Sequence, residues 1–225
     1  FWRKENGEWD LAGKSGTCIP VRDEKGDITS IKIRVDKPST PSRKYLLLSS
    51  NPKPDPKTGE VKYIAGTSAK IALHYPLGRS KTIKVLRITE GEIKADIASS
   101  LTEVYTISLP GVAAWRMALE AIKALKPKKV LLAFDSDKDQ SQSTYDDPSG
   151  GPDDKFLVGR SVASLYLSAK EAGFDVGIED WPAEAGKGID DVLMNGATDQ
   201  IRILTEEEAE DFSNAMLIAG IPKGW

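Results

Sequence analysis

The chain has 225 residues, of which 40% are hydrophobic and 29% are charged, so a buried core is expected and wholesale disorder is excluded. No apolar run approaches the roughly 20 residues that span a bilayer, and there is no signal-peptide pattern, so a membrane is not an expected partner. The single cysteine, Cys18, excludes an internal disulfide framework and a multi-cysteine zinc site within this chain. It fits a reducing cytoplasm, which is the expected location, and Cys18 itself is expected to be a small core residue.

The two halves of the chain carry opposite charge. Residues 1–89 contain 18 Lys and Arg against 9 Asp and Glu, whereas the remaining residues contain 13 against 25. A basic front half and an acidic rear half favour a polyanionic partner for the first and bound cations for the second. Ordinary solvated surface is the alternative interpretation.

The front half has a pattern of short strands. An alternation of apolar and polar residues predicts strands at 18–22 and 28–35, joined as a hairpin, with a further strand at 44–48. A loop rich in Pro, Lys and Gly follows at 51–62. We expect residues 1–84 to form a small, basic, β-rich subdomain. The only histidine, His74, is expected to be structural.

From residue 85 onward strands and helices alternate, which predicts an α/β domain with a mainly parallel, four-stranded sheet and flanking helices. This domain is expected to span 85–197, and 198–225 forms a C-terminal extension with a short strand and an acidic helix near 205–218. A long polar loop is expected at 138–154. The expected strands are 85–89, 104–108, 129–134 and 175–180, and the expected helices are 92–100, 112–125 and 154–172.

Acidic residues follow three of these strands. Glu90 follows the first, Asp135 and Asp137 follow the third, and Asp190 and Asp191 follow the fourth through a glycine-rich turn. Parallel strands end at one edge of the sheet, so these carboxylates are expected to cluster there. Hard oxygen ligands without His or Cys suit Mg²⁺ or Mn²⁺, and such ions assist chemistry on phosphates. Taken alone, Glu90 is equally well explained as a helix N-terminal acid.

These acidic segments resemble a known domain. Ile88-Thr89-Glu90-Gly91, Phe134-Asp135-Ser136-Asp137 and Gly188-Ile189-Asp190-Asp191 are similar to the motifs of the Toprim domain, which is shared by DnaG-type primases, topoisomerases and some nucleases. Upstream, Ile19 to Asp23, Gly26, Ile33-Arg34 and Lys44-Tyr45-Leu46 resemble the basic N-terminal subdomain of the DnaG-type primase core. The resemblance covers about residues 17–197, and it is greatest to primases and primase–helicases of plasmids and phages.

The resemblance implies roles for individual residues. Glu90, Asp135 and Asp137 would be catalytic and would bind metal, together with Asp190 and Asp191. The residues that would contact nucleic acid or nucleotide are Arg22, Lys32, Arg34, Arg43, Lys44 and Lys94. The chain departs from the family at Lys94, because an acid usually stands four residues after the glutamate, and Asp96 would face differently on a helix.

The expected function is metal-dependent nucleotidyl transfer, namely DNA-templated RNA primer synthesis in the replication of a plasmid, phage or other mobile element. Mg²⁺ or Mn²⁺ is the expected cofactor, without zinc in this chain. Single-stranded DNA template and nucleoside triphosphates are the expected partners, and a fused or separate helicase is a candidate partner. The alternatives are a Toprim-type metal-dependent nuclease and a non-catalytic nucleic-acid-binding module. A haloacid-dehalogenase-like phosphatase fits less well, since its Asp-x-Asp follows the first strand.

Overall fold

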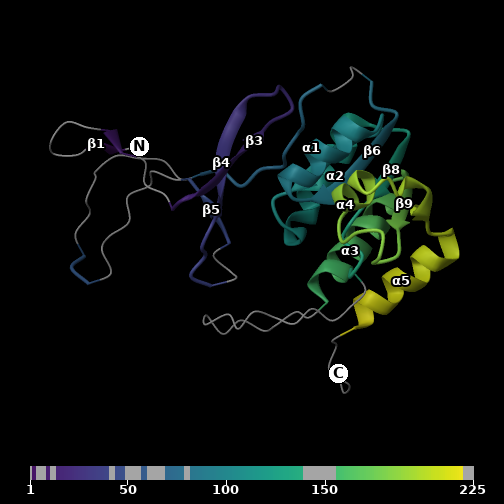
Figure 1. Cartoon of the computed structure of the whole chain (residues 1–225). Coiled ribbons are helices and arrows are strands. Elements are labelled where there is room, and N and C mark those ends of the chain that lie inside the picture. The colour runs from purple at the N-terminus through teal and green to yellow at the C-terminus, as the bar shows by residue number, and fades with distance from the viewer. Residues whose placement is uncertain are drawn as a thin grey trace. The chain divides into compact units, whose positions relative to one another are not determined.

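The computed structural model describes residues 2–3, 9–10, 14–40, 44–48, 57–59, 69–78, 82–138 and 156–219. The chain divides into two compact units, Phe1–Ala72 and Leu73–Trp225 (Figure 1). Arg43 and most of the expected loop at 138–154 lie outside the described residues. The domain boundaries given above stay predictions.

The first unit is built from short antiparallel strands. A two-stranded sheet pairs β1 (Trp2–Arg3) with β2 (Trp9–Asp10). A three-stranded sheet has the order β3 (Gly16–Arg22), β4 (Ile28–Val35) and β5 (Tyr45–Leu47). The predicted hairpin and the strand that follows it are therefore confirmed. The buried side chains of this sheet are mainly β-branched, which suits the pleated surface: they are Ile19, Val21, Ser30, Ile33 and Val35.

The expectation that Cys18 lies in the core is wrong, because its side chain is exposed. Strand β3 is an edge strand of its sheet, and its first three residues are all exposed, so that burial begins only at Ile19. Sequence alternation fixes which residues share a face of a strand, but it does not tell which end of that strand is covered.

The second unit contains a five-stranded sheet. Its order is β10-β9-β8-β6-β7. Strands β6, β7, β8 and β9 are parallel, and β10 joins β9 antiparallel at the edge. The predicted α/β class with a mainly parallel sheet is confirmed, and the C-terminal extension supplies the fifth strand. The bounds are β6 Val85–Glu90, β7 Tyr105–Leu109, β8 Lys129–Leu132, β9 Asp175–Asp180 and β10 Arg202–Ile203.

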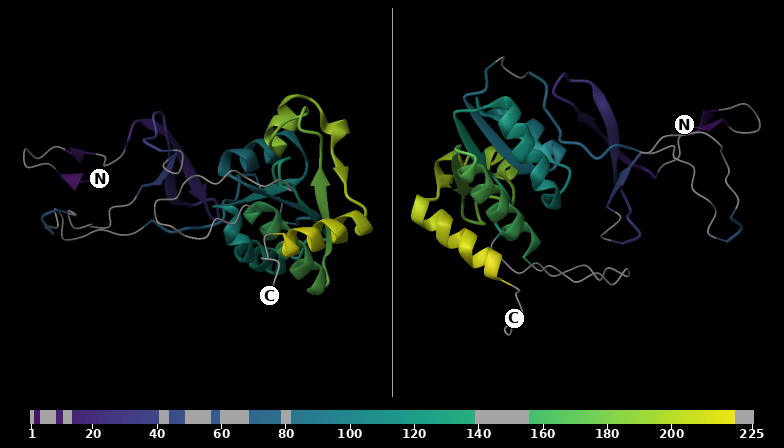
Figure 2. Two further views of the ribbon diagram at one scale, coloured as in Figure 1. Left: turned by 90° about the horizontal axis from the view of Figure 1, so that it is seen from below. Right: turned by 180° about the vertical axis from the view of Figure 1, so that it is seen from behind.

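Helices cover both faces of this sheet (Figure 2). Helices α1 (Glu92–Leu101) and α4 (Ile189–Met194) pack on one face around Ala98, Ala133 and Trp181. The other face carries α2 (Trp115–Leu125), α3 (Leu157–Glu171) and α5 (Glu206–Ile218), packed on the larger apolar core. Short 3₁₀ helices lie at Val112–Ala114 and Thr198–Gln200. None of the helices among the described residues is long and apolar enough to cross a membrane.

The segment before β6 extends this unit at its edge. The backbone N–H of His74 donates to the carbonyl of Ser108 at 3.0 Å, and the N–H of Ser108 donates back at 3.1 Å. The imidazole is 1% exposed, and its Nε2 lies 3.1 Å from a carboxylate oxygen of Asp96. His74 therefore has a structural place, as expected, and Asp96 points toward it.

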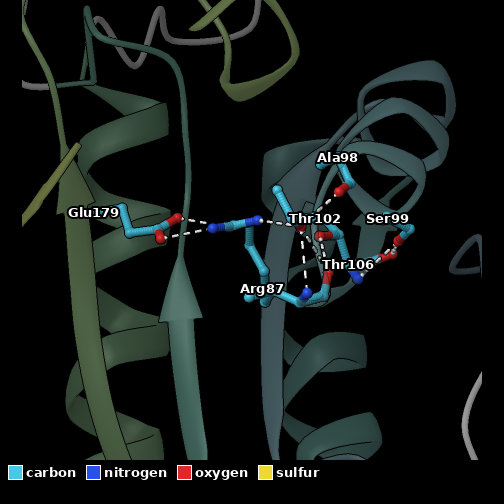
Figure 3. A network of polar contacts seen from close by, with 7 residues as sticks. Arg87, Ala98, Ser99, Thr102, Thr106 and Glu179 are labelled. Atoms are coloured by element: carbon cyan, nitrogen blue, oxygen red, sulfur yellow. Dashed lines mark hydrogen bonds and ion pairs between the residues drawn. The ribbon is translucent and has the colours of Figure 1, made fainter. Parts of the chain in front are cut away.

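A buried ion pair crosses the middle of the sheet. Arg87 on β6 and Glu179 on β9 are 5% and 3% exposed, and β8 lies between their strands. The guanidinium donates to the two carboxylate oxygens at 2.7 and 2.9 Å, and it also donates to the Thr102 hydroxyl at 3.4 Å (Figure 3). A bidentate, charge-assisted contact of this kind holds the two side chains in a defined geometry and compensates both charges.

We expect Arg87→Met to lower the free energy of unfolding by about 3–5 kcal/mol, because it leaves the Glu179 carboxylate buried without its partner. Urea denaturation followed by circular dichroism measures the loss. The double variant Arg87→Met/Glu179→Leu should recover most of it, since both buried charges are then removed. Lys123→Met, which breaks an exposed pair with Glu120, is the control and should cost less than about 1 kcal/mol. Equal losses in the single and double variants would contradict this account.

Candidate functional site

The strand order reverses at β6, because the chain runs from β6 to β7 on one side and then to β8 on the other. In open α/β sheets, ligands bind outside the carboxyl ends of the strands at such a switch point. Glu90 is the last residue of β6, and Asp135 follows shortly after β8. The parallel pairing of β6 with β8 therefore places both acids at the same edge of the sheet.

A tight turn at Gly91 sets Glu90 apart from the helix that follows. Gly91 has φ of 94°, a left-handed conformation that a residue with a Cβ rarely adopts. Glu92 then opens α1 and is only 3% exposed, whereas Glu90 is partly exposed. Of the two glutamates in this turn, Glu90 is thus the one accessible from the solvent.

Two turns that carry acidic residues are joined through the main chain. The N–H of Ser136 donates to the carbonyl of Lys187 at 2.9 Å, which links the turn after β8 to the turn before α4. The N–H of Lys138 donates to the carbonyl of Asp135 at 3.0 Å and closes the first of these turns. The turn after β8 and the turn before α4 are consequently held side by side.

Lys94 on α1 reaches into this group of acids. Its ammonium binds Oδ1 of Asp135. A Cβ added to Gly188 would lie 2.8 Å from Nζ of Lys94 and 2.5 Å from Oδ1 of Asp190, so both groups crowd the same point. Lys94 therefore sits among the carboxylates, at the position where the resemblance led us to expect an acid.

A second lysine lies at the outer side of the same acids. Nζ of Lys187 is 3.0 Å from Oδ2 of Asp137 and 3.9 Å from Oδ2 of Asp135. Its side chain is 64% exposed, against 24% for Lys94. Lys187 is not among the site residues that the resemblance to the Toprim domain implies. The available signal was its place in the glycine-rich turn that leads to Asp190.

Two carboxylate oxygens of this cluster are buried without a hydrogen-bond donor among the described residues. Oδ1 of Asp137 and Oδ1 of Asp190 are buried and make no hydrogen bond within the described part of the chain. Burial raises the pKa of the Asp190 carboxyl, and Asp191 adds to this rise while Lys94 opposes it. Buried acceptors without a donor are rare and costly, so these two oxygens are the ones most suited to an incoming cation or donor.

Asp191 has a different environment from Asp190. Its Oδ2 accepts a hydrogen bond from the N–H of Gly188 at 3.1 Å, which caps the first turn of α4. This contact gives Asp191 a structural role that the sequence did not reveal. Among the described residues, no group of three or more His, Cys, Asp or Glu side chains is placed to hold a metal ion.

Apart from Lys94, the predicted basic residues that are described lie on or beside the strands of the three-stranded sheet of the first unit. Arg34 and Lys44 line one hollow of about 390 Å³, together with Thr17, Val35, Asp36 and Pro38. The ammonium groups of Lys32 and Lys44 lie 5.9 and 5.7 Å from the centre of the Tyr45 ring. Arg22 instead donates to the carbonyl of Gly26 at 3.1 Å and closes the hairpin turn. The structure thus brings Lys32, Arg34 and Lys44 together, whereas Arg22 stabilises the turn of the hairpin.

The chain is similar to one protein family and to several solved structures. A family model described as "Domain of unknown function (DUF3854)" matches residues 78–200, and no curated protein matches the chain. A DNA primase domain from Pseudomonas aeruginosa is 18% identical with a TM-score of 0.51, covering 84% of this chain and 52% of its own. The zinc-binding and RNA polymerase domains of the Aquifex aeolicus primase are 15% identical with a TM-score of 0.44, covering 88% of this chain and 39% of their own. A DnaG primase catalytic domain bound to single-stranded DNA is 14% identical with a TM-score of 0.46, covering 89% and 53%.

The similarity to the Pseudomonas aeruginosa domain shows a shared fold. This chain spans about half the length of that domain. The predicted primase-core fold is therefore confirmed, while the roles of individual residues stay predictions.

We expect Asp190→Asn to raise the melting temperature at neutral pH in the presence of a chelator. The raised pKa of this carboxyl means that the folded wild type binds a proton more readily than the unfolded chain. Wild-type stability consequently falls as the pH rises from the ordinary carboxyl value through the raised one. The gain of the variant should shrink again as the pH is lowered through that range. Thermal melts between about pH 4 and 8 measure it.

Asp191→Ala is the matched variant. It removes the acceptor of the Gly188 N–H and should cost about 1 kcal/mol of stability. A loss of stability in Asp190→Asn at neutral pH would contradict the account of the Asp190 environment.

Proposed function

This chain belongs to the family described as a domain of unknown function (DUF3854), and we propose that it catalyses nucleotidyl transfer with Mg²⁺ or Mn²⁺ to make short RNA primers on a DNA template. The observation that carries the proposal is the carboxylate cluster at the switch point of the sheet. In it, the buried oxygens Asp137 Oδ1 and Asp190 Oδ1 lack hydrogen-bond partners among the described residues. The primase-core fold and the resemblance of the acidic segments to Toprim motifs support the same function.

The donor type of the cluster suits a hard divalent cation, and the acidic side chains would have to close around the ion to hold it. The donors are carboxylate oxygens only, which Mg²⁺ and Mn²⁺ prefer. Asp137 and Asp190 would hold the ion through their unpartnered oxygens, with Asp135 and Glu90 as further ligands. Bound there, the ion would orient a nucleotide's phosphates and neutralise the charge that develops on them.

The lysines of the site contribute the remaining positive charge. Lys187 is mostly exposed and rests on Asp137, so a phosphate group that approaches the cluster meets its ammonium first. A lysine ammonium is a compact, mobile donor, and it can move from a carboxylate to a phosphate over a short path. Lys187 would thereby bind and orient the incoming triphosphate.

The basic sheet of the first unit would hold the nucleic acid. Lys32, Arg34, Lys44 and the predicted Arg43 would contact backbone phosphates, which gives affinity without sequence preference. Tyr45, with two ammonium groups near its ring, adds a surface on which a base can stack. We place the activity in the replication of a plasmid, phage or other mobile element, with a fused or separate helicase as partner, because the Toprim resemblance is greatest to such proteins.

We expect Asp137→Asn to lower primer synthesis by about 100-fold or more, because it removes charge stabilisation at the reacting phosphates. The assay follows labelled ribonucleotides on single-stranded DNA with Mg²⁺ or Mn²⁺. Asp199→Asn, at an exposed acid in a 3₁₀ helix, is the control and should retain full activity.

The same assay without nucleotides distinguishes a nuclease. Cleavage of the DNA, abolished in Asp137→Asn, would assign the cluster to hydrolysis and overturn the proposal. Retention of synthesis in Asp137→Asn would show that the cluster is not the site.

We also expect the affinity for single-stranded DNA to fall as the salt concentration rises, with a slope that reports the number of phosphate contacts. Arg34→Ala and Lys44→Ala should each reduce the slope of log K against log salt by about 0.7, because each removes one phosphate contact. Fluorescence anisotropy with an oligothymidylate at about 50–200 mM salt measures the slope. Lys123→Ala, on α2 of the second unit, should leave it unchanged. Wild-type slopes in both Arg34→Ala and Lys44→Ala would show that the three-stranded sheet does not bind the nucleic acid.

A further inference from the structure

We propose that Lys138 is a positioning residue that holds the turn carrying Asp135 and Asp137 on the end of β9, and that Arg202 in the C-terminal extension supports it. Neither residue is one that would meet the substrate, and Arg202 lies beyond residues 78–200, which the family model matches. The inference rests on the proposed function for the use of this turn, because that function assigns the reaction to its acids.

The side chain of Lys138 is held inside the protein by a carboxylate and an aromatic ring. It is only 4% exposed. Its ammonium donates to Oδ1 of Asp180, the last residue of β9, at 2.7 Å, and it lies 5.6 Å from the centre of the Trp181 ring. A buried charge is costly without its partner, and a cation over an indole face is further stabilised. Lys138 therefore holds its own turn against the end of β9.

Trp181 connects this contact to the second acidic turn. Its ring is buried, and its Nε1 donates to the carbonyl of Gly186 at 3.0 Å. The next residue, Lys187, accepts the hydrogen bond from the N–H of Ser136. The main-chain bond sets the spacing between the two turns, whereas the contacts of Lys138 and Trp181 attach both turns to the end of the sheet.

Arg202 on β10 keeps the Asp180 carboxylate directed at Lys138. Its guanidinium donates to Oδ2 of Asp180 at 3.2 Å and to Oε1 of Glu208 at 2.7 Å. Glu208 is itself held, because it accepts a hydrogen bond from the N–H of Thr205 at the start of α5, at 2.8 Å. The Asp180 side chain is 29% exposed, so Arg202 opposes the rotation of this carboxylate toward water.

The same turn packs against helices α3 and α5. A Cβ added to Gly159 in α3 would lie 2.6 Å from the carbonyl oxygen of Lys138 and 2.4 Å from Sδ of Met216 in α5. Only glycine fits where the turn and the two helices meet. The C-terminal extension thus supports the turn through packing as well as through charge.

Amide hydrogen exchange, followed by NMR on the full chain without substrates, tests the positioning. The N–H of Ser136 reports on the turn, and the amides of β6 report on the sheet. Lys138→Met removes the ammonium and leaves Asp180 paired with Arg202. We expect the protection of the Ser136 N–H to fall about tenfold or more relative to the β6 amides, because the turn opens locally. Lys138→Arg should retain most of the protection, since a guanidinium can still donate to Asp180.

Lys129→Met is the matched control. Lys129 pairs with Asp175 at 4.0 Å between the same two strands, β8 and β9, at their amino ends. Its loss should leave the protection of Ser136 unchanged. Arg202→Gln should lower the protection by about threefold only, because exposed ion pairs contribute less than buried ones.

The primer-synthesis assay gives the second readout. Lys138→Met should lower kcat by about tenfold, because the acids of the turn are then misplaced for the reaction. KM for the nucleotides should change less than kcat, since Lys187 would still bind the triphosphate. Lys138→Arg should restore kcat.

The outcomes separate this inference from the proposed function. Unchanged protection of Ser136 in Lys138→Met would overturn the inference, and so would an equal loss at Ser136 and in β6, or a wild-type kcat in that variant. If Lys138→Met unfolds, Arg202→Gln decides by the same measurements. A wild type that makes no primers, while protection is lost in Lys138→Met and kept in Lys129→Met, refutes only the proposed function.

Discussion

The ion pair between Arg87 and Glu179 is the constraint on which the site depends. It joins β6 to β9 across β8, and these are the strands whose carboxyl ends lead to the acids of the site. A buried charge without its partner costs several kcal/mol, so the pair penalises any slip of these strands relative to one another. Arg87 lies three residues before Glu90 on β6, and Glu179 is the second-last residue of β9. The pair therefore fixes the relative positions of the two strands close to the edge of the sheet that carries the site.

The need to compensate charge also governs the carboxylates of the site. Carboxylates brought together repel, and each gains stability only through a counter-charge or a donor. Lys94, Lys187 and the Gly188 N–H supply these for Asp135, Asp137 and Asp191. Two carboxylate oxygens, on Asp137 and Asp190, remain buried without a donor among the described residues, and a cation or donor would be most stabilising there. The acids of the site are therefore only partly compensated, and the uncompensated oxygens lie where we propose that the reaction takes place.

The sequence predicted the parallel sheet well and the partners of the acids poorly. Buried strands such as Val85–Ile88 and the acids that follow them are read from local periodicity, and parallel topology then gathers Glu90, Asp135 and Asp190 at one edge. Lys94 and Lys187 are different, since their contacts depend on which way long side chains turn after folding. Sequence patterns assign no role to Asp96, whereas in the fold it lies beside His74. The exposure of Cys18 is not predictable from alternation, because burial of an edge strand depends on the whole sheet.

The hydrogen bond from Ser136 to Lys187 uses main-chain atoms only. Any side chain except proline at position 136, and any side chain at position 187, keeps it. The scaffold that sets the spacing of the acidic turns is therefore independent of the chemical groups mounted on it. Within such a frame, an acid and a lysine can stand in for one another at a position such as 94, which alters what the cluster binds without a change of fold.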